Sequence, residues 1–392
     1  MNKVNIGVLG IGDISDVYIN NLKKYDIVNI VACASRHLKK AQKKAAQHNI
    51  PKAYATGDEL IKDPNIDVIL NLTLPEVHAS LTMKALNAGK HVYSEKPLAA
   101  TFEEGEEILS LAKEKGLSVG CAPDTFLGGR LQTCRKIIDD GSIGDVIGAS
   151  AFFLSHGHES FYPTPEFFYL PGGGPLLDMG PYYITALLSL IGPVKKCCAM
   201  SKKTFDKRKI GDGPKKGEIF DVVVDTHITG VIEFNNGAIA TLTTSFDVWD
   251  SALPRLEIYG TKGTICINDT DPADGPNLFG GPVFLMTQDR YRWQIVPKLR
   301  RKPYDEWEEV KVVHPFNETS HEKNSRGIGL VDMVYAIRDK RPIRASGEMA
   351  LHSLEAMMGL IKSAKEERYY YLKTTFQQPI PLPVNFPESE DK

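Results

Sequence analysis

The sequence predicts an α/β protein of two domains: an N-terminal domain with a doubly wound parallel sheet, and a C-terminal α+β domain with a large, open, mainly antiparallel sheet. Its 392 residues exceed what one typical hydrophobic core holds. The first third alternates strand-like and helix-like segments, whereas the sequence after about residue 122 alternates apolar and polar residues at period two. We therefore expect domains at 1–122 and 123–375, followed by a tail at 376–392.

Short apolar runs alternate with charged, helical stretches in the first domain. The predicted strands are VNIGVLG, IVNIVACAS, DVILNL and HVYSE, and the helical stretches between them are DISDVYINNLKKY, HLKKAQKKAAQHN and HASLTMKALNAG. Strands joined by helices form right-handed βαβ units, so the sheet should be parallel and covered on both faces. This is the Rossmann type of dinucleotide-binding architecture.

Long alternating segments dominate the second domain. VVVDTHITGVIEFNNGAIATLTTSF predicts a hairpin that turns at Asn236 and Gly237, and RLEIYGTKGTICI predicts a second that turns within residues 260–263. The tail from residue 377, rich in proline and acid, predicts a poorly ordered terminus or a strap onto a partner subunit.

Composition restricts the partners. A net charge of -2, with 24% charged and 42% hydrophobic residues, argues against nucleic acid or an anionic membrane as the main partner. The sequence has no apolar run of about 18 residues and enters a strand-like segment directly, which predicts a cytoplasmic protein without a membrane span. The basic segment at 195–216 is either a nucleic-acid patch or a solvated loop and strand edge; it lacks the interleaved aromatic residues of the former.

The six cysteines show no CxxC spacing, which predicts unpaired, reduced thiols. Adjacent Cys197 and Cys198 are either a metal or redox site or ordinary strand residues.

A glycine-rich turn follows the first strand. Gly10 permits a tight turn, and Gly12 lets a pyrophosphate approach the backbone where Asp13 and Ile14 open a helix. Ser15 takes the place of the third glycine of this fingerprint, at a position where a small residue packs. The context of strand, turn and helix predicts a dinucleotide site.

The end of the second strand lacks the acidic residue that binds the ribose hydroxyl of NAD. Ser35 and Arg36 stand there instead, with donors and positive charge that suit a 2′-phosphate. This favours NADP as the cofactor, with NAD as the alternative, because an arginine can also stack on the adenine of either.

Glu95, Lys96 and Pro97 follow the strand HVYSE. The carboxyl end of a parallel strand faces the cofactor crevice, so Lys96 is expected to point toward the nicotinamide. The alternative is a salt bridge between the neighbouring Glu and Lys side chains. The proline stiffens the chain where the lysine must be aimed.

These segments, with NLTLPEVHASLTMKALNAGKHVYSEKPLA and GGGPLLDMGPYYITALLSLIGPV, resemble the Gfo/Idh/MocA oxidoreductase family. The resemblance implies a Rossmann domain, tightly bound NAD(P), and a homodimer or homotetramer formed through the C-terminal sheet. It also implies that Lys96, Asp178 and Tyr182 carry the chemistry.

The resemblance further places Asn71, Pro75 and His78 near the cofactor, after the fourth strand. Leu74 departs from the threonine that the family often has before this proline. His78 is alternatively a helix-capping or core histidine.

Asp178 and Tyr182 are spaced i, i+4, so on a helix both face the same way. Pro181 is tolerated only near a first turn, which predicts a helix that begins around residues 178–181. We expect Tyr182 to act as general acid and base, Lys96 to polarise the reacting oxygen, and Asp178 to orient the lysine or the substrate. Tyr183, about 100° further round the helix, should pack in the core or an interface.

The loop at 155–174 is rich in aromatic residues that suit stacking on a sugar ring. We expect His156, His158 and Tyr162 to contact substrate, together with Asp124 and Thr125. A metal held by the two histidines and Glu159 is the alternative, although their spacing gives poor ligand geometry.

The sequence thus predicts an NAD(P)-dependent oxidoreductase that acts on a secondary hydroxyl or ketone of a sugar, inositol or glycoside. Two alternatives stay open: a sensor that binds NAD(P) without turnover, and a redox glycosidase that keeps NAD bound.

Overall fold

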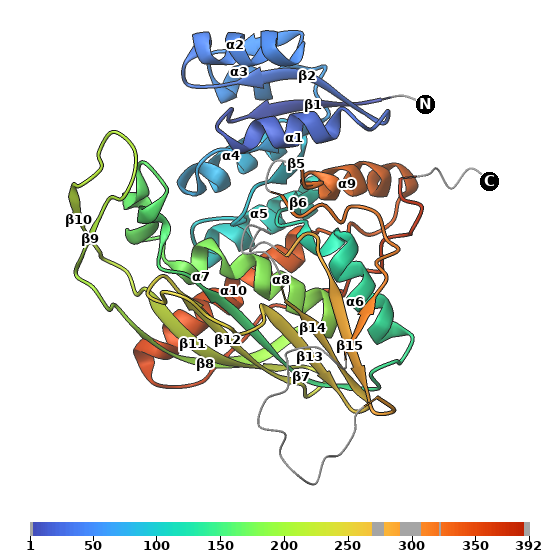
Figure 1. Cartoon of the computed structure of the whole chain (residues 1–392). Helices are drawn as coiled ribbons and strands as arrows, with labels where there is room; N and C mark the ends of the chain where they lie inside the picture. Colours follow the sequence, from blue (N-terminus) through green and yellow to red (C-terminus); the bar gives the residue numbers. More distant parts are fainter. Residues whose placement is uncertain (1–2, 269–277, 291–306, 321–322, 388–392) are drawn as a thin grey trace. The chain divides into compact units, whose positions relative to one another are not determined.

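The computed structural model describes residues 3–268, 278–290, 307–320 and 323–387, and the chain forms two compact units (Figure 1). The first unit comprises residues 1–127, 321–354 and 376–392, and the second comprises 128–320 and 355–375. We expected two continuous domains at 1–122 and 123–375. The observed units are instead discontinuous in sequence, because the chain returns twice to the first unit.

The first unit contains a six-stranded, all-parallel sheet with the order β3-β2-β1-β4-β5-β6. Its strands are β1 (Val4–Leu9), β2 (Val28–Ala34), β3 (Lys52–Tyr54), β4 (Val68–Asn71), β5 (His91–Ser94) and β6 (Val119–Cys121). This is the strand order of the Rossmann fold, which confirms the expected architecture. The order reverses between β1 and β4, and at such a point ligands bind beyond the carboxyl ends of the strands.

Helices accompany these strands in the first unit, and some of them begin or end at clear local signals. They are α1 (Ile14–Leu22), α2 (Leu38–His48), α3 (Gly57–Ile61), α4 (Pro75–Asn87), α5 (Phe102–Lys115), η1 (Thr125–Leu127) and α9 (Ile328–Asp339). Thr101 and Glu104 form a capping box at the start of α5, and Gly116 ends it in the left-handed conformation.

The described part of the tail, residues 376–387, is held on the first unit. The Arg344 guanidinium donates to the carbonyls of Ile380 and Pro381, and the ring of Phe386 packs on Tyr335. Of our two alternatives, the poorly ordered terminus is wrong for these residues, because their carbonyls accept hydrogen bonds from a buried arginine, and the strap onto a partner subunit stays a prediction. Residues 388–392 lie outside the described residues.

The second unit contains a nine-stranded sheet with the order β16-β15-β14-β13-β7-β12-β11-β8-β17. The strands are β7 (Val146–Leu154), β8 (Val194–Lys202), β11 (His227–Phe234), β12 (Ile239–Ser245), β13 (Leu256–Gly260), β14 (Gly263–Ile267), β15 (Val283–Thr287), β16 (Glu308–Val310) and β17 (Tyr370–Tyr371). Every pair is antiparallel except β7 with β12. Both expected hairpins, β11 with β12 and β13 with β14, are confirmed.

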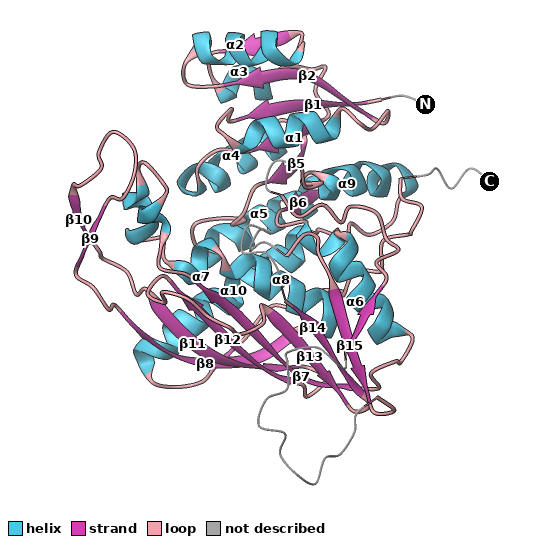
Figure 2. Cartoon of the chain, in the orientation of Figure 1, coloured by secondary structure: helices cyan, strands magenta, loops and turns pink. Residues whose placement is uncertain are grey.

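Helices pack on one face of this sheet, as Figure 2 shows for α8 and α10. The helices of the unit are α6 (Gly129–Asp139), η2 (His158–Ser160), η3 (Pro165–Tyr169), α7 (Pro175–Asp178), α8 (Gly180–Ile191) and the later part of α10 (Gly347–Glu366). Tyr183 of α8 packs on Phe153 of β7, with ring centroids 6.1 Å apart. Tyr183 is fully buried, which confirms its expected packing role.

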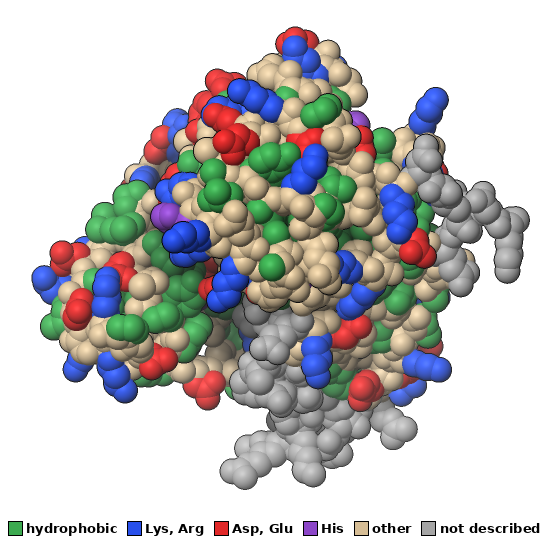
Figure 3. Space-filling view, turned by 90° about the horizontal axis from the view of Figure 1, so that it is seen from above, with side chains coloured by type: hydrophobic (Ala, Val, Ile, Leu, Met, Phe, Trp, Pro, Cys, Tyr) green, Lys and Arg blue, Asp and Glu red, His purple; other side chains and the backbone are tan. Residues whose placement is uncertain are grey.

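The basic segment at 195–216 is largely neutralised by acidic partners. A small two-stranded sheet, β9 (Lys207–Lys209) with β10 (Ile219–Asp221), lies within and after it. Lys195, Lys203 and Lys215 each form an ion pair with a carboxylate. On the face seen in Figure 3, acidic and basic side chains are interspersed. These ion pairs favour the solvated loop and strand edge of our two alternatives.

The cysteines are free thiols, and Cys197 and Cys198 are neighbours on β8. Burial raises the pKa of Cys197 to about 12, which leaves it a protonated, unreactive thiol. No helix in the described ranges is long and apolar enough to cross a membrane.

Candidate active site

Three predicted cofactor residues lie at the carboxyl ends of adjacent strands in the first unit. Gly10 follows β1, Asn71 ends β4 and Glu95 follows β5. The strands are in register there, because Leu9 pairs with Asn71 and Asn71 with Ser94. The fold thus gathers residues that are far apart in sequence at the edge where α/β sheets bind ligands.

The glycine turn has two glycines with different constraints. Gly10 has a φ of +87°, and a Cβ there would lie 2.5 Å from the carbonyl oxygen of Leu72. A Cβ on Gly12 would meet no heavy atom within 4 Å, so the backbone there faces open space. Asp13 and Ile14 open α1 without a side-chain cap, and Ser15 is buried and donates to the Gly12 carbonyl. The turn fits a pyrophosphate at a helix N-terminus.

Ser35 and Arg36 follow β2. Ser35 accepts a hydrogen bond from the backbone N–H of His37 at 3.3 Å. Arg36 is exposed, and none of the hydrogen bonds or ion pairs found among the described residues involves it. Its guanidinium is therefore available to a phosphate or an adenine ring.

Asn71 and His78 fasten the turn between β4 and α4. The Asn71 side chain donates to the His78 carbonyl and accepts from Thr73, and it is fully buried. His78 is also fully buried, with Nδ1 2.7 Å from the Pro97 carbonyl and Nε2 2.8 Å from the Thr73 carbonyl. His78 is therefore a core histidine, which was one of the two roles that we considered for it besides a cofactor contact. Its ring connects the turn after β4 to the segment after Lys96.

Leu74 and Pro75 stand at the start of α4. Pro75 occupies its first turn, where a missing N–H costs nothing. Leu74, at the N-cap, is exposed and supplies no side-chain cap. The hydrogen bond that a threonine would offer there is thus absent.

Glu95 belongs to a buried polar cluster. Its Oε1 accepts from the Tyr18 hydroxyl at 2.8 Å and from the Arg326 guanidinium at 2.9 Å, while Oε2 accepts from the Lys96 backbone N–H. Burial by itself raises the pKa of Glu95, but the charges of Arg326 and Lys96 outweigh it and hold that pKa below its ordinary value. Glu95 thus fixes the backbone that carries the partly buried Lys96, whose peptide bond to Pro97 is cis.

Asp124 and Thr125 are buried after β6. Asp124 accepts from the backbone N–H groups of Gly327 and Gly329 at 2.8 and 2.9 Å, so its carboxylate caps the N-terminus of α9. Burial raises the pKa of Asp124, and these donors partly offset the increase. The substrate contact expected for the two residues stays a prediction, whereas the helix-capping role is observed.

In the second unit, a run of glycines precedes the helix that ends at Asp178. Gly172 and Gly174 have φ values of +89° and +90°, which side chains rarely allow. Asp178 ends α7, and Tyr182 lies in the first turn of α8, after Pro181. The segment is therefore two short helices joined at Met179, where we expected one that begins around 178–181. Pro181 sits in a first turn as predicted.

His158 pairs with Asp178. Its Nε2 lies 3.2 Å from Asp178 Oδ2. The ring is held among Phe161, Phe168 and Phe246, with centroid distances of 5.4, 4.1 and 4.9 Å. His158 thus contacts the predicted catalytic carboxylate, and the substrate contact that we expected for His158 stays a prediction.

His156 lies on the indole of Trp249, with ring centroids 3.4 Å apart and planes 13° from parallel. Trp249 remains 81% exposed. Tyr162 packs edge-on against Phe167 and Phe168, on the same loop.

A buried arginine anchors this loop. Arg208 forms ion pairs with Glu159 and Asp247 and donates to the His156 carbonyl. Glu159 also accepts from the Tyr169 hydroxyl, so its carboxylate is engaged by two protein donors. Within the described part of the chain, no group of three or more His, Cys, Asp or Glu side chains is arranged to hold a metal.

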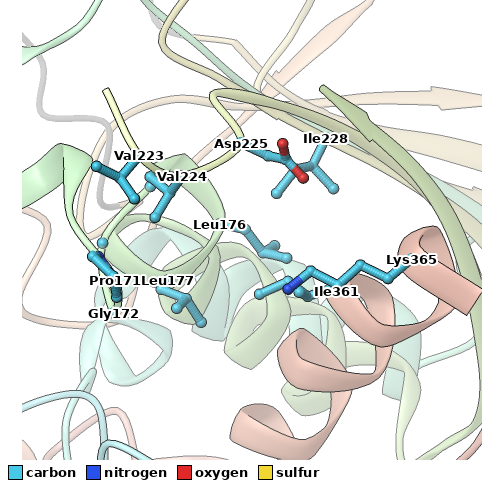
Figure 4. Close-up of a pocket in the computed structure, with 12 residues that line it drawn as sticks. Pro171, Gly172, Leu176, Leu177, Val223, Val224, Asp225, Ile228, Ile361 and Lys365 are labelled. Carbon is cyan, nitrogen blue, oxygen red and sulfur yellow. The ribbon is translucent and has the colours of Figure 1, made fainter. Parts of the chain in front are cut away.

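A separate cavity of about 340 Å³ lies on another side of α7 (Figure 4). Its walls are mainly apolar, with Leu176 and Ile361 among them, and they carry the charges of Asp225 and Lys365. Its lining does not include Asp178, Tyr182 or either histidine of the loop.

The sequence did not reveal Arg326, Arg208 or Trp249. Arg326 lies 231 positions from Glu95, and Arg208 lies 49 from Glu159. Such pairs leave no local signal in one sequence. Trp249 offered a weak one, an aromatic residue three positions after a predicted strand.

The parallel sheet in this order, with a glycine turn after β1, defines a dinucleotide-binding protein of the Rossmann class. Residues 4–122 match the oxidoreductase family with an NAD-binding Rossmann fold, and residues 131–266 match the GFO/IDH/MocA C-terminal domain. The chain belongs to the Gfo/Idh/MocA oxidoreductase family.

Similar proteins include dehydrogenases. The chain is 30% identical over 265 residues to trans-1,2-dihydrobenzene-1,2-diol dehydrogenase of Xenopus laevis, covering 67% of this chain and 74% of that protein. It is 25% identical to D-xylose dehydrogenase of Paenarthrobacter nicotinovorans, covering 67% and 71%. An NAD-binding oxidoreductase from Klebsiella pneumoniae has the same fold, with a TM-score of 0.79, 20% identity, and coverage of 94% and 99%.

Proposed function

We propose that the protein is an NADP-preferring dehydrogenase or reductase that transfers hydride between the nicotinamide and a secondary hydroxyl or ketone of a sugar, inositol or glycoside. The observation that carries the proposal is the pairing of Asp178 with His158, four residues before Tyr182 in the chain. It builds a proton-handling group beside a loop of aromatic side chains. The named relatives that act on a diol and on xylose support this substrate class.

The chain's residues must bind the cofactor and the substrate, orient them and move a proton. The bound cofactor supplies the hydride acceptor or donor. Tyr182 takes the proton from the hydroxyl and returns it in the reverse reaction, while Asp178, in contact with His158, orients the lysine or the substrate. Lys96, fixed through Glu95, polarises the reacting oxygen. These roles follow the family resemblance of the three residues.

The cofactor preference rests on Arg36. An exposed guanidinium after β2, where NAD-specific sites carry an acid, suits a 2′-phosphate. Titration with NADPH and with NADH should show tighter binding of NADPH, and Arg36→Ala should remove the difference. NADH binding about tenfold tighter, or about 1.4 kcal/mol more favourable, would overturn the assignment.

The activity is tested with a panel of free sugars, pyranosides, inositols and 3-oxo-sugars, each with both cofactors. Reduction or oxidation of the nicotinamide by at least one compound is the expected result. Release of an aglycone without change in nicotinamide absorbance would instead indicate a redox glycosidase, and binding without either reaction would indicate a sensor.

We also propose that the protein forms a homodimer or homotetramer through the nine-stranded sheet. Met200, Val231 and Ile239 are exposed on three adjacent strands, β8, β11 and β12. Their register places them on one face, since Met200 pairs with Thr229 and Ile239 with Glu233, both two positions from Val231. An exposed apolar sheet face of this kind is typical of protein interfaces.

A further inference from the structure

Trp249 and His156 form an aromatic platform that the roles above do not use. The two rings are stacked, so His156 covers one face of the indole. The indole is nevertheless 81% exposed, which leaves its other face open. An indole with one face supported and the other open can stack on the apolar face of a ligand ring.

The platform is rigidly supported. Arg208, only 4% of whose side chain is exposed, donates to the His156 carbonyl and pairs with Asp247, two positions before Trp249. The backbone N–H of Val248 donates to the Ser155 carbonyl at 3.1 Å, joining the two segments directly. The stack is thus fixed from both sides before any ligand arrives, and a fixed platform loses little entropy on binding.

The platform is also close to the predicted chemistry. His156 is two residues from His158, whose Nε2 lies 3.2 Å from Asp178. Two residues span at most about 7 Å of chain. One short segment, from His156 to His158, therefore contacts both the Trp249 indole and the carboxylate that we expect to orient the lysine or the substrate.

We propose that Trp249 binds a second ring of the substrate, so that the preferred substrates are two-ring glycosides with an apolar ring face attached to the oxidised sugar. This inference rests on the proposed function and narrows its substrate class. The second ring is a pyranose, as in a disaccharide, or an aryl aglycone, because both present an apolar face that stacks on indole. A monosaccharide would leave the platform uncovered.

The test compares one-ring and two-ring compounds on the NADP-loaded protein. Methyl β-D-glucoside is compared with phenyl β-D-glucoside and cellobiose, and methyl β-D-xyloside with xylobiose, by calorimetric titration and by turnover. We expect a two-ring compound to bind about fivefold to tenfold tighter than its methyl counterpart, the range of one aromatic stacking contact. Tighter binding of phenyl glucoside would identify the second ring as an aryl aglycone, and tighter binding of the disaccharide would identify it as a sugar.

Trp249→Ala should reduce this affinity ratio to near one, and Trp249→Phe should retain part of it. Leu253→Ala is the matched control, since Leu253 is exposed on the same loop and the ratio should persist. An equal affinity of one-ring and two-ring compounds, or a ratio unchanged in Trp249→Ala, overturns the proposal. So does a change of oligomeric mass in Trp249→Ala with the ratio kept, which would assign the surface to a second copy of the chain.

Failure of the proposed function gives a different result. Turnover with none of the compounds, while the calorimetric ratio holds, counts against the oxidoreductase reaction and leaves the two-ring site standing.

Discussion

At the scale of single residues, Tyr182 and Tyr183 show how position decides the role of one side-chain type. Both are buried, but Tyr183 packs on Phe153 in the core of the second unit. Tyr182 lies in the first turn of α8, next to the segment that ends with Asp178. The sequence predicts different roles because adjacent helical residues face about 100° apart; the packing of Tyr183 is confirmed, and the catalytic role of Tyr182 stays a prediction.

Tyr182→Phe should therefore lower turnover at least about tenfold and leave NADPH binding unchanged, because it removes only the group that moves the proton. Steady-state kinetics and cofactor titration measure the two effects. Tyr183→Phe is the matched control and should retain most of the turnover. Equal losses in the two variants would contradict the role of Tyr182.

Glu95 and Arg326 are a buried pair whose loss should cost stability. Removing one partner of such a pair typically costs about 3–5 kcal/mol, because the other charge stays buried. Glu95→Gln and Arg326→Met should each lower the unfolding free energy by about this amount in denaturant titrations. The double variant should lose less than the sum. Strictly additive losses would show that the two side chains do not act as a pair.

The pH dependence of this pair has a definite sign. The pKa of Glu95 is held below its ordinary value of 4.5, so its contribution is complete above that pH and is lost as the pH falls through the lower, folded value. The unfolding free energy should therefore fall less steeply with decreasing pH in Glu95→Gln than in the wild-type protein, as measured between about pH 5 and pH 3. An unchanged slope would contradict the depressed pKa.

At the scale of elements, the two glycines of the turn between β1 and α1 are needed for different reasons, one for folding and the other for ligand binding. Gly10 is confined by its positive φ and by the Leu72 carbonyl, whereas Gly12 faces open space. The sequence motif named both glycines without distinguishing these reasons.

Gly10→Ala should destabilise the protein by about 1–3 kcal/mol, the cost of a strained backbone position. Gly12→Ala should leave the unfolding free energy within about 0.5 kcal/mol and weaken cofactor binding, because its Cβ enters the space meant for the pyrophosphate. Thermal unfolding without cofactor and titration with NADPH separate the two effects. Full cofactor affinity in Gly12→Ala would show that the pyrophosphate does not approach this turn.

Helix α9 illustrates an element whose place the sequence could not show. Its N-terminus is capped by Asp124, which lies some 200 residues earlier, and the loop before it supplies Arg326 to Glu95. The sequence predicts a substrate contact for Asp124 because this residue follows a strand of the parallel sheet. A buried carboxylate beside a helix N-terminus looks the same in sequence as one beside a ligand.

At the scale of the whole molecule, the exposed face of the nine-stranded sheet predicts the assembly. Val231→Glu would place a charge in the centre of the proposed interface and should dissociate the oligomer, as measured by sedimentation. Ile219→Glu is the control, because Ile219 is also an exposed apolar residue but lies on the small sheet of β9 and β10. A monomeric wild-type protein, or an oligomer unaffected by Val231→Glu, would rule out this face.

The sequence by itself determined the two sheet types, both hairpins, the glycine turn and the spacing of Asp178 and Tyr182. These features are local, since periodicity, turn chemistry and helix geometry act within a few residues. Only the tertiary structure decided that Glu95 pairs with Arg326, that Asp124 caps α9, that His158 holds Asp178, and that Trp249 stacks on His156. Each of these contacts joins segments brought together by the folding of their unit, and a contact across a long loop depends on the path of the whole chain and not on the residues that flank it.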